Sequence, residues 1–160
     1  MNIQYQLTEL AQKLISQGID VRPIRGSTFA AGMDLCACIE EPVTIYPGVI
    51  TKIYTGIKVY LGEEPNDPVQ LAGLYLPRSS NSEMVLANTI GLLDADFQGE
   101  SFVKLTARNE SFVVKPGDRL VQLVVIPTVV TTWDEVSEFS STTQRGEGGD
   151  GSTGGNYIHG

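Results

Sequence analysis

Several short segments of the chain combine residue types that can bind phosphate groups. The segment at 145–154 reads Arg-Gly-Glu-Gly-Gly-Asp-Gly-Ser-Thr-Gly. Its glycines allow backbone N–H groups to approach an anion, Arg145 offers a forked cation, and Ser152 and Thr153 add hydroxyl donors. The same composition is typical of a flexible linker. On composition alone, a phosphate-binding segment and a linker therefore both remain open.

Other polar residues lie inside or directly after apolar, strand-like runs. Asp34 lies within the run 31–36 and Gln122 within the run 120–125, so a buried carboxylate and a buried amide each need hydrogen-bonding or charged partners. Arg78, Ser79 and Ser80 follow the apolar run at 69–76. At a strand end they can hold phosphate oxygens, or they can form an ordinary capped turn.

Carboxylates gather at 91–100, which reads Gly-Leu-Leu-Asp-Ala-Asp-Phe-Gln-Gly-Glu. In an extended chain Asp94 and Asp96 share one face and repel each other. One of them can then accept a proton from a water molecule. A solvated acidic hairpin explains the same residues without chemistry.

The elements that must position these residues are short strands. Apolar or alternating runs rich in Val, Ile, Thr and Tyr are separated by turn signals such as Pro47-Gly48. The predicted strands are Met33–Cys38, Val43–Tyr46, Val49–Thr55, Ile57–Leu61, Val69–Leu76, Met84–Ala87, Phe102–Ala107, Ser111–Val114, Leu120–Ile126 and Val129–Trp133. Many short strands without intervening helices indicate an all-β jelly roll or a related β-barrel.

The two ends of the chain differ from this middle part. Apolar residues at helical spacing predict an amphipathic helix over 4–17, ended by Gly18. Residues 137–160 are poor in apolar side chains, which predicts a flexible arm. We therefore expect a helical extension at 1–19, a β domain at 20–136 and an arm at 137–160. The helix is a candidate surface for a protein partner.

Composition narrows the class of protein. The 160 residues carry a net charge of −8, which disfavours binding to nucleic acid, although a local arginine cluster can still hold a small anion. Cys36 and Cys38 are the two cysteines and share a strand face, so we expect buried free thiols in a reducing compartment. The sequence has no signal-peptide pattern and no membrane-length apolar run, which predicts a cytoplasmic protein without a membrane partner.

The order of the segments is more specific than any one of them. The ordered motifs are Ala-Gly-x-Asp-Leu at 31–35, Pro-Arg-Ser-Ser at 77–80, Gly-Leu-Leu-Asp-x-Asp-Phe-x-Gly at 91–99, Pro-Gly-Asp-Arg-x-x-Gln at 116–122, and the segment at 145–154. In this order they resemble the five motifs of the homotrimeric dUTP pyrophosphatases (dUTPases). The resemblance implies a jelly-roll trimer with sites at subunit interfaces, which hydrolyses dUTP to dUMP and pyrophosphate with Mg²⁺.

The resemblance also implies roles for individual residues around the nucleotide. Asp94 would orient and deprotonate the water that attacks the α-phosphorus. Asn88 would read the uracil edge together with hairpin backbone groups at Gly91, because an amide matches its donor and acceptor pattern. Phe97 would pack under the deoxyribose and exclude a 2′-hydroxyl.

Further roles concern the triphosphate and the metal. The resemblance places Asp34 near Mg²⁺ through the water shell, with no direct protein ligand, because Mg²⁺ binds mainly through substrate phosphates and water. The remaining residues would contact the phosphates or belong to the arm that closes over the nucleotide: Arg78, Ser79, Ser80, Gln122, Arg145, Gly149, Asp150, Gly151, Ser152 and Thr153.

Two positions depart from the family pattern. Phe97 stands where the family usually has Tyr, so the ring is kept and sugar discrimination should persist. Asp150 stands where the family usually has an aromatic residue that stacks on uracil. Loss of stacking worth about 1–3 kcal/mol is expected to weaken productive binding.

Three other functions are alternatives to dUTP hydrolysis. A dCTP deaminase shares the fold, but segments 91–99 and 145–154 resemble the pyrophosphatase versions. A nucleotide-binding regulatory protein with slow turnover would explain Asp150, whereas Asp94, Arg78 and Arg145 favour an enzyme. A plain β-sandwich interaction module would leave the ordered motifs as coincidence.

Overall fold

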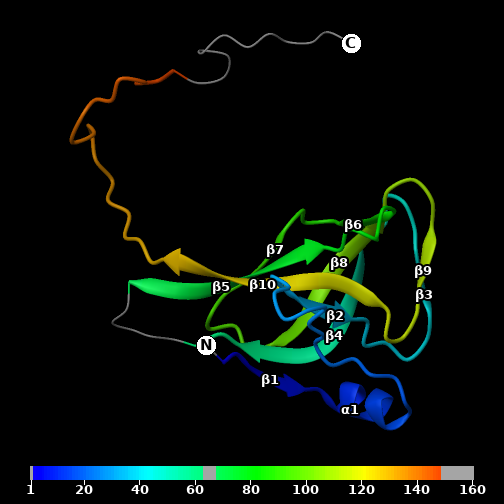
Figure 1. Ribbon diagram of the computed structural model, residues 1–160. Coiled ribbons are helices and arrows are strands. Elements are labelled where there is room, and N and C mark those ends of the chain that lie inside the picture. The colour runs from blue at the N-terminus through cyan, green and yellow to red at the C-terminus, as the bar shows by residue number, and fades with distance from the viewer. Residues whose placement is uncertain (1, 63–67, 149–160) are drawn as a thin grey trace. The chain divides into compact units, whose positions relative to one another are not determined.

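The computed structural model describes residues 2–62 and 68–148 of the chain. The chain divides into two units, Met1–Val130 and Thr131–Gly160. All helices and strands of the described residues lie in the first unit (Figure 1). They are β1 (Gln4–Leu7), α1 (Glu9–Ser16), β2 (Met33–Cys36), β3 (Val43–Ile45), β4 (Thr51–Tyr60), β5 (Val69–Pro77), β6 (Met84–Leu86), β7 (Gly91–Leu93), β8 (Glu100–Ala107), β9 (Phe112–Val114) and β10 (Arg119–Val129).

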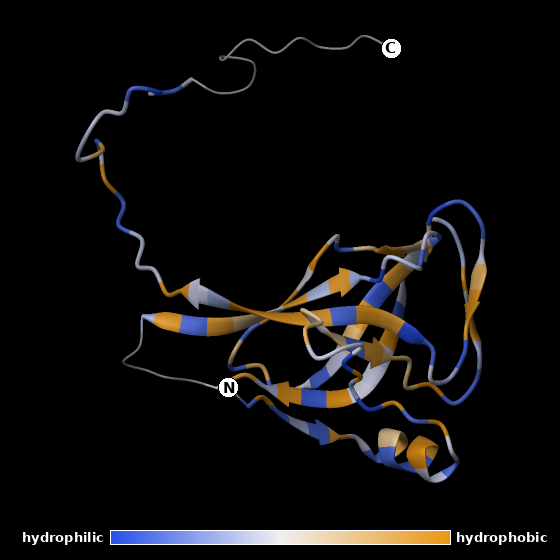
Figure 2. Ribbon diagram, in the orientation of Figure 1, coloured by the Kyte–Doolittle hydropathy of each residue, from blue (hydrophilic) through white to orange (hydrophobic). Residues whose placement is uncertain are grey.

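Two antiparallel sheets enclose one hydrophobic core. The first sheet has the strand order β1-β4-β8-β6, the second has the order β2-β10-β5-β7, and β3 pairs with β9 as a separate ribbon. Side chains from both sheets, including Ile53, Leu105 and Val121, are buried together between them. Hydrophobic and hydrophilic residues alternate along the strands, as expected for sheets with one face on a core (Figure 2). The predicted all-β, jelly-roll-like fold is confirmed.

The N-terminal prediction is partly wrong. Residues Gln4–Leu7 form the strand β1, which pairs with Tyr60–Ile57 of β4, and the helix is shorter than the expected span 4–17. The helix begins after Thr8, whose Oγ1 accepts a hydrogen bond from the Ala11 N–H at 3.3 Å. The open edge of β4 offers backbone partners to residues 4–7, and these outweigh their helical spacing. Gly18, at φ 88°, follows the helix end as predicted.

The structure also differs from the prediction at other strands. The runs at 49–55 and 57–61 form one strand, β4, with Gly56 at φ 73° inside a register shift. A Cβ at Gly56 would lie 2.6 Å from the Cys38 sulfur, so only glycine fits there. The predicted strand Val129–Trp133 is wrong. The strand β10 ends at Val129, because its partner β5 begins at Val69, which pairs with Val129. The strand β7 was not predicted.

A second, smaller core lies under α1. Ala11 and Leu14 of the helix pack with Val21, Cys36 and Cys38. Both cysteines are free and buried, which confirms the prediction from their spacing. Burial raises the pKa of the Cys36 thiol to about 11, so it is uncharged and unreactive at neutral pH. Among the described residues, no helix is long and apolar enough to span a bilayer.

Candidate functional site

The most densely connected polar cluster surrounds Asp34 of β2. Gln122 of the neighbouring strand β10 lies directly opposite Asp34, and its Nε2 donates to Asp34 Oδ1 at 3.2 Å. Arg119 begins β10, and one of its terminal nitrogens donates to Asp34 Oδ2 at 3.3 Å. Arg78 follows β5, the next strand of the sheet, and its Nε lies 3.2 Å from the same oxygen. The strand order therefore joins three predicted site residues that are distant in sequence.

The charges of this cluster do not balance. The Asp34 side chain is only 6% exposed, and a carboxylate at that depth requires compensation by cations and donors. Arg78 and Arg119 together carry one more charge than Asp34 neutralises. The Nε of Arg78 is buried and makes an ion pair with Asp34, but no hydrogen bond within the described chain. Guanidinium groups with spare N–H donors and a net positive charge suit phosphate oxygens.

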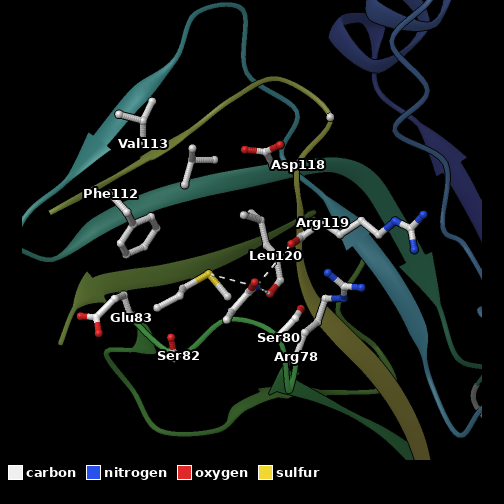
Figure 3. A pocket seen from close by; sticks show the side chains of 13 residues that line it. Arg78, Ser80, Ser82, Glu83, Phe112, Val113, Asp118, Arg119 and Leu120 are labelled. Atoms are coloured by element: carbon white, nitrogen blue, oxygen red, sulfur yellow. Dashed lines mark hydrogen bonds between the residues drawn. The ribbon is translucent and has the colours of Figure 1, made fainter. Parts of the chain in front are cut away.

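The turn after β5 adds hydroxyl groups next to these arginines. Ser79 and Ser80 are exposed, and the Asn81 N–H closes the turn by donating to the Arg78 carbonyl at 3.1 Å. A cavity of about 650 Å³ borders the turn and is lined by Arg78, Ser80 and Arg119 on one side (Figure 3). The predicted phosphate-contacting residues Arg78, Ser79, Ser80 and Gln122 thus lie on neighbouring elements.

The turn between β6 of the first sheet and β7 of the second carries Asn88, and Gly91 begins β7. The Thr89 N–H donates to the Leu86 carbonyl at 3.0 Å, and Thr89 has φ 61°, an unfavourable value for a β-branched residue. A Cβ at Gly91 would lie 2.8 Å from the Tyr75 ring, so glycine is required for this close approach. Strain of this kind is commonly found at ligand sites.

Asp94 and Phe97 lie in the turn that follows β7. Asp94 is exposed, and its carbonyl accepts a hydrogen bond from the Phe97 N–H at 3.2 Å. No described side chain or backbone donor contacts the Asp94 carboxylate. The Phe97 ring packs on Gly99, where a Cβ would overlap it, and is 42% exposed. Both side chains are therefore available to a ligand or to another subunit.

Within one chain, Asp94 does not reach the Asp34 cluster. The strands β10 and β5 separate β7 from β2, which is about 14 Å at the usual spacing between strands. Leu93 pairs with Gly73, whereas Gln122 pairs with Leu76, so the two regions also differ in height along the sheet. The predicted site residues therefore form two groups in a single subunit.

Arg119 is a site residue that the sequence reasoning did not assign. In a regular strand, Arg119 and Gln122 would point to opposite faces. The register of β10 against β2 shifts between Arg119 and Val121, and this bulge directs both side chains to Asp34. The sequence signal for Arg119 was its place in the motif Pro-Gly-Asp-Arg-x-x-Gln at 116–122, to which no role was assigned.

The C-terminal candidates cannot be placed against this cluster. Arg145 belongs to the second unit, where its Nε donates to the Gly148 carbonyl at 2.7 Å. The other residues predicted for the C-terminal arm lie outside the described residues: Gly149, Asp150, Gly151, Ser152 and Thr153.

Comparisons with known proteins agree with this fold and these motifs. The sequence model of the dUTPase family matches residues 21–154. A deoxyuridine 5′-triphosphate nucleotidohydrolase of Psychrobacter cryohalolentis is 44% identical over 136 residues, covering 82% of this chain and 85% of its own. One of Neisseria meningitidis serogroup A is 40% identical over 158 residues, covering 96% and 99%. The chain belongs to the dUTPase family.

Solved structures show the same fold at lower sequence identity. The dUTPase of Staphylococcus bacteriophage 80alpha with dUPNHPP has a TM-score of 0.73 and 24% identity, covering 96% of this chain and 98% of its own. A dUTPase mutant from phage phi11 of S. aureus, described with a structural Mg(II) ion, has a TM-score of 0.66 and 22% identity, covering 87% and 99%. Both likenesses concern the fold.

Proposed function

We propose that this protein hydrolyses dUTP to dUMP and pyrophosphate. The observation that carries the proposal is the net positive cluster of Asp34, Arg78, Arg119 and Gln122 in a chain of this family. Phosphoryl transfer depends mainly on positioning and on neutralising phosphate charge, and two fixed arginines beside exposed serines supply both. The curated relatives named above are dUTP nucleotidohydrolases, which supports the same substrate.

Asp94 is the proposed general base. Its carboxylate is exposed and accepts no hydrogen bond from the described chain, so it is available to orient a water and take its proton. Asp96 is exposed as well, but the family motif assigns the role to the first aspartate. Asp94 would direct the water at the α-phosphorus while the arginines hold the triphosphate.

The segment 86–93, which connects the two sheets, is the proposed uracil site. The Asn88 amide offers a donor and an acceptor, as the uracil edge requires. A Cβ at Gly91 would lie 3.5 Å from the Asn88 amide nitrogen and 2.8 Å from the Tyr75 ring, so glycine leaves space beside the amide. Phe97, which is exposed and follows β7 in the sequence, would contact the deoxyribose and leave no room for a 2′-hydroxyl. The surrounding turn holds Thr89 at an unfavourable φ of 61°.

A homotrimer with shared sites is the proposed assembly. The strands β10 and β5 lie between β7, which leads to Asp94, and β2, which carries Asp34, a spacing of about 14 Å, so a complete site would take Asp94 from one subunit and the Asp34 cluster from another. Large apolar side chains exposed in the described chain, such as Trp133 at 93% and Phe139 at 90%, are typical of surfaces that associate.

Mg²⁺ is the proposed cofactor, and the residues fit outer-shell binding. Gln122 occupies one oxygen of Asp34 and the two arginines occupy the other, so direct coordination would break these contacts. No cluster of three or more metal-ligating side chains occurs in the described ranges. When bound to the phosphates, the ion would neutralise part of their charge, while Asp34 would hold its water shell.

The segment at 145–153 is proposed to close over the phosphates, with Arg145, Gly149, Gly151, Ser152 and Thr153 as its contacts. Asp150 would weaken closure because it offers no ring for uracil. We also propose the division into 1–19, 20–136 and 137–160, and an intracellular location, which the unpaired Cys36 and Cys38 favour.

A single assay tests the proposal against its alternatives. Pyrophosphate release is measured with Mg²⁺ and each common deoxynucleoside triphosphate in turn. We expect turnover of dUTP in strong preference to the others. Ammonia released from dCTP would instead indicate a deaminase, and tight dUTP binding without turnover would indicate a regulatory protein.

A further inference from the structure

Asn81 joins the phosphate-side turn to the start of β10. Its side-chain Nδ2 donates to the Leu120 carbonyl at 3.2 Å and to the Arg119 carbonyl at 3.4 Å. Both partners are acceptors, so the amide nitrogen and not the oxygen must face them. The Asn81 backbone N–H also donates to the Arg78 carbonyl at 3.1 Å. One residue therefore contacts the backbone of both arginines in the Asp34 cluster.

These bonds replace sheet pairing at the point where it stops. The first residue pair between β10 and β5 is Val121 with Pro77, so Arg119 and Leu120 precede that ladder. The bulge that directs Arg119 to Asp34 lies at the same place. A bulge interrupts regular hydrogen bonds, and the half-buried Asn81 amide supplies donors to the carbonyls beside it.

We propose that Asn81 is a positioning residue that sets the separation of Arg78 and Arg119 for the triphosphate. This inference rests on the proposed function. Asn81 acts through the backbone of the two arginines and does not need to touch the nucleotide. Without its bonds, the turn of Arg78, Ser79 and Ser80 is free to move relative to Arg119, and the guanidinium groups no longer meet the same phosphate chain.

Glu83 offers a matched comparison on the same segment. Its Oε2 accepts hydrogen bonds from the Asn109 N–H at 3.1 Å and the Glu110 N–H at 3.3 Å. These backbone donors lower the pKa of the Glu83 carboxyl, so it stays charged. Neither bond involves an arginine of the cluster, and Glu83 lies beside Phe112 on the side away from the guanidinium groups (Figure 3). Glu83 anchors the segment without setting the arginine pair.

The test compares Asn81→Ala, Asn81→Asp and Glu83→Ala with the unchanged protein. Affinities are measured for deoxyuridine, inorganic triphosphate and a dUTP analogue with an imido bridge between the α- and β-phosphorus, alongside kcat, KM and Tm. For Asn81→Ala we expect about a fivefold to tenfold loss of affinity for triphosphate and the analogue, and no change for deoxyuridine. Asn81→Asp, nearly the same shape, should lose more because its carboxylate would face two carbonyls.

Three results would overturn the inference. The first is an equal loss for deoxyuridine and the phosphate ligands, and the second is a fall in Tm with unchanged affinities. The third is the same pattern of affinity losses in Glu83→Ala, which would show that any contact holding this segment has the effect and that Asn81 has no special role. If the unchanged protein binds triphosphate but does not hydrolyse dUTP, the proposed function fails, while triphosphate affinity still decides the role of Asn81.

Discussion

The two halves of the proposed site differ in how complete they are in one chain. Around Asp34, two cations and an amide already meet a buried carboxylate, and Asn81 donates hydrogen bonds to the backbone carbonyls of both arginines. The segment after β6 presents its residues outward, with Asp94 exposed and Phe97 42% exposed. The residues around Asp34 are already fixed by contacts within one chain, whereas Asp94 and Phe97 are exposed and free to contact a ligand or another subunit. Under the proposed function, this difference means that folding of one chain forms the phosphate-binding half, and that assembly of subunits completes the site.

The largest expected effect comes from the incomplete half. Asp94→Asn keeps the shape of the turn but removes the proton acceptor, so kcat should fall by about 10²–10⁴-fold while nucleotide affinity is kept. Steady-state kinetics and binding of the imido analogue measure the two quantities. Asp96→Asn, two residues away and equally exposed, is the control and should keep its activity. Full turnover in Asp94→Asn would remove this residue from the mechanism.

A change in the preorganised half should affect stability as well as activity. Asp34→Asn leaves two guanidinium groups without their counter-charge, and the free energy of unfolding should fall by about 1–3 kcal/mol. The loss stays below that of a fully buried pair because the Arg119 side chain is 46% exposed. Urea denaturation measures it. Unchanged stability would show that the cluster is not held by the carboxylate.

The smallest expected effect is a change in stability from the strained turn between β6 and β7. Thr89→Gly relieves an unfavourable φ of 61°, and this gain exceeds the entropy that glycine adds to the unfolded chain, so stability should rise by about 1 kcal/mol. Deoxyuridine affinity should fall because the loop is less fixed. Ile90→Gly, at an ordinary φ, is the matched control and should lower stability. A stability loss in both variants would argue against strain at Thr89.

Sequence reasoning found more of the site's residues than of their arrangement. Asp34 and Gln122 were selected because polar groups in apolar runs need partners, and they are each other's partners. Arg119 was not assigned, because the bulge that turns it toward Asp34 is a property of strand pairing. The spacing of apolar residues at 4–7 predicts a helix, but the open edge of β4 pairs with them as a strand, and a partner strand cannot be seen in the local sequence. The separation of Asp94 from Arg78 likewise depends on strand register, because Leu93, directly before Asp94, pairs with Gly73, well before Arg78.

Mixing two inactive variants tests the shared site most directly. Asp94→Asn subunits lack the base and Arg78→Ala subunits lack a phosphate-binding cation, so neither homotrimer should hydrolyse dUTP. If each site takes the base from one subunit and the arginines from its neighbour, random co-assembly should restore about a quarter of the sites. Recovered dUTP hydrolysis at that level is the predicted result. No recovery, with mixed trimers shown to form, would contradict a site shared in this way.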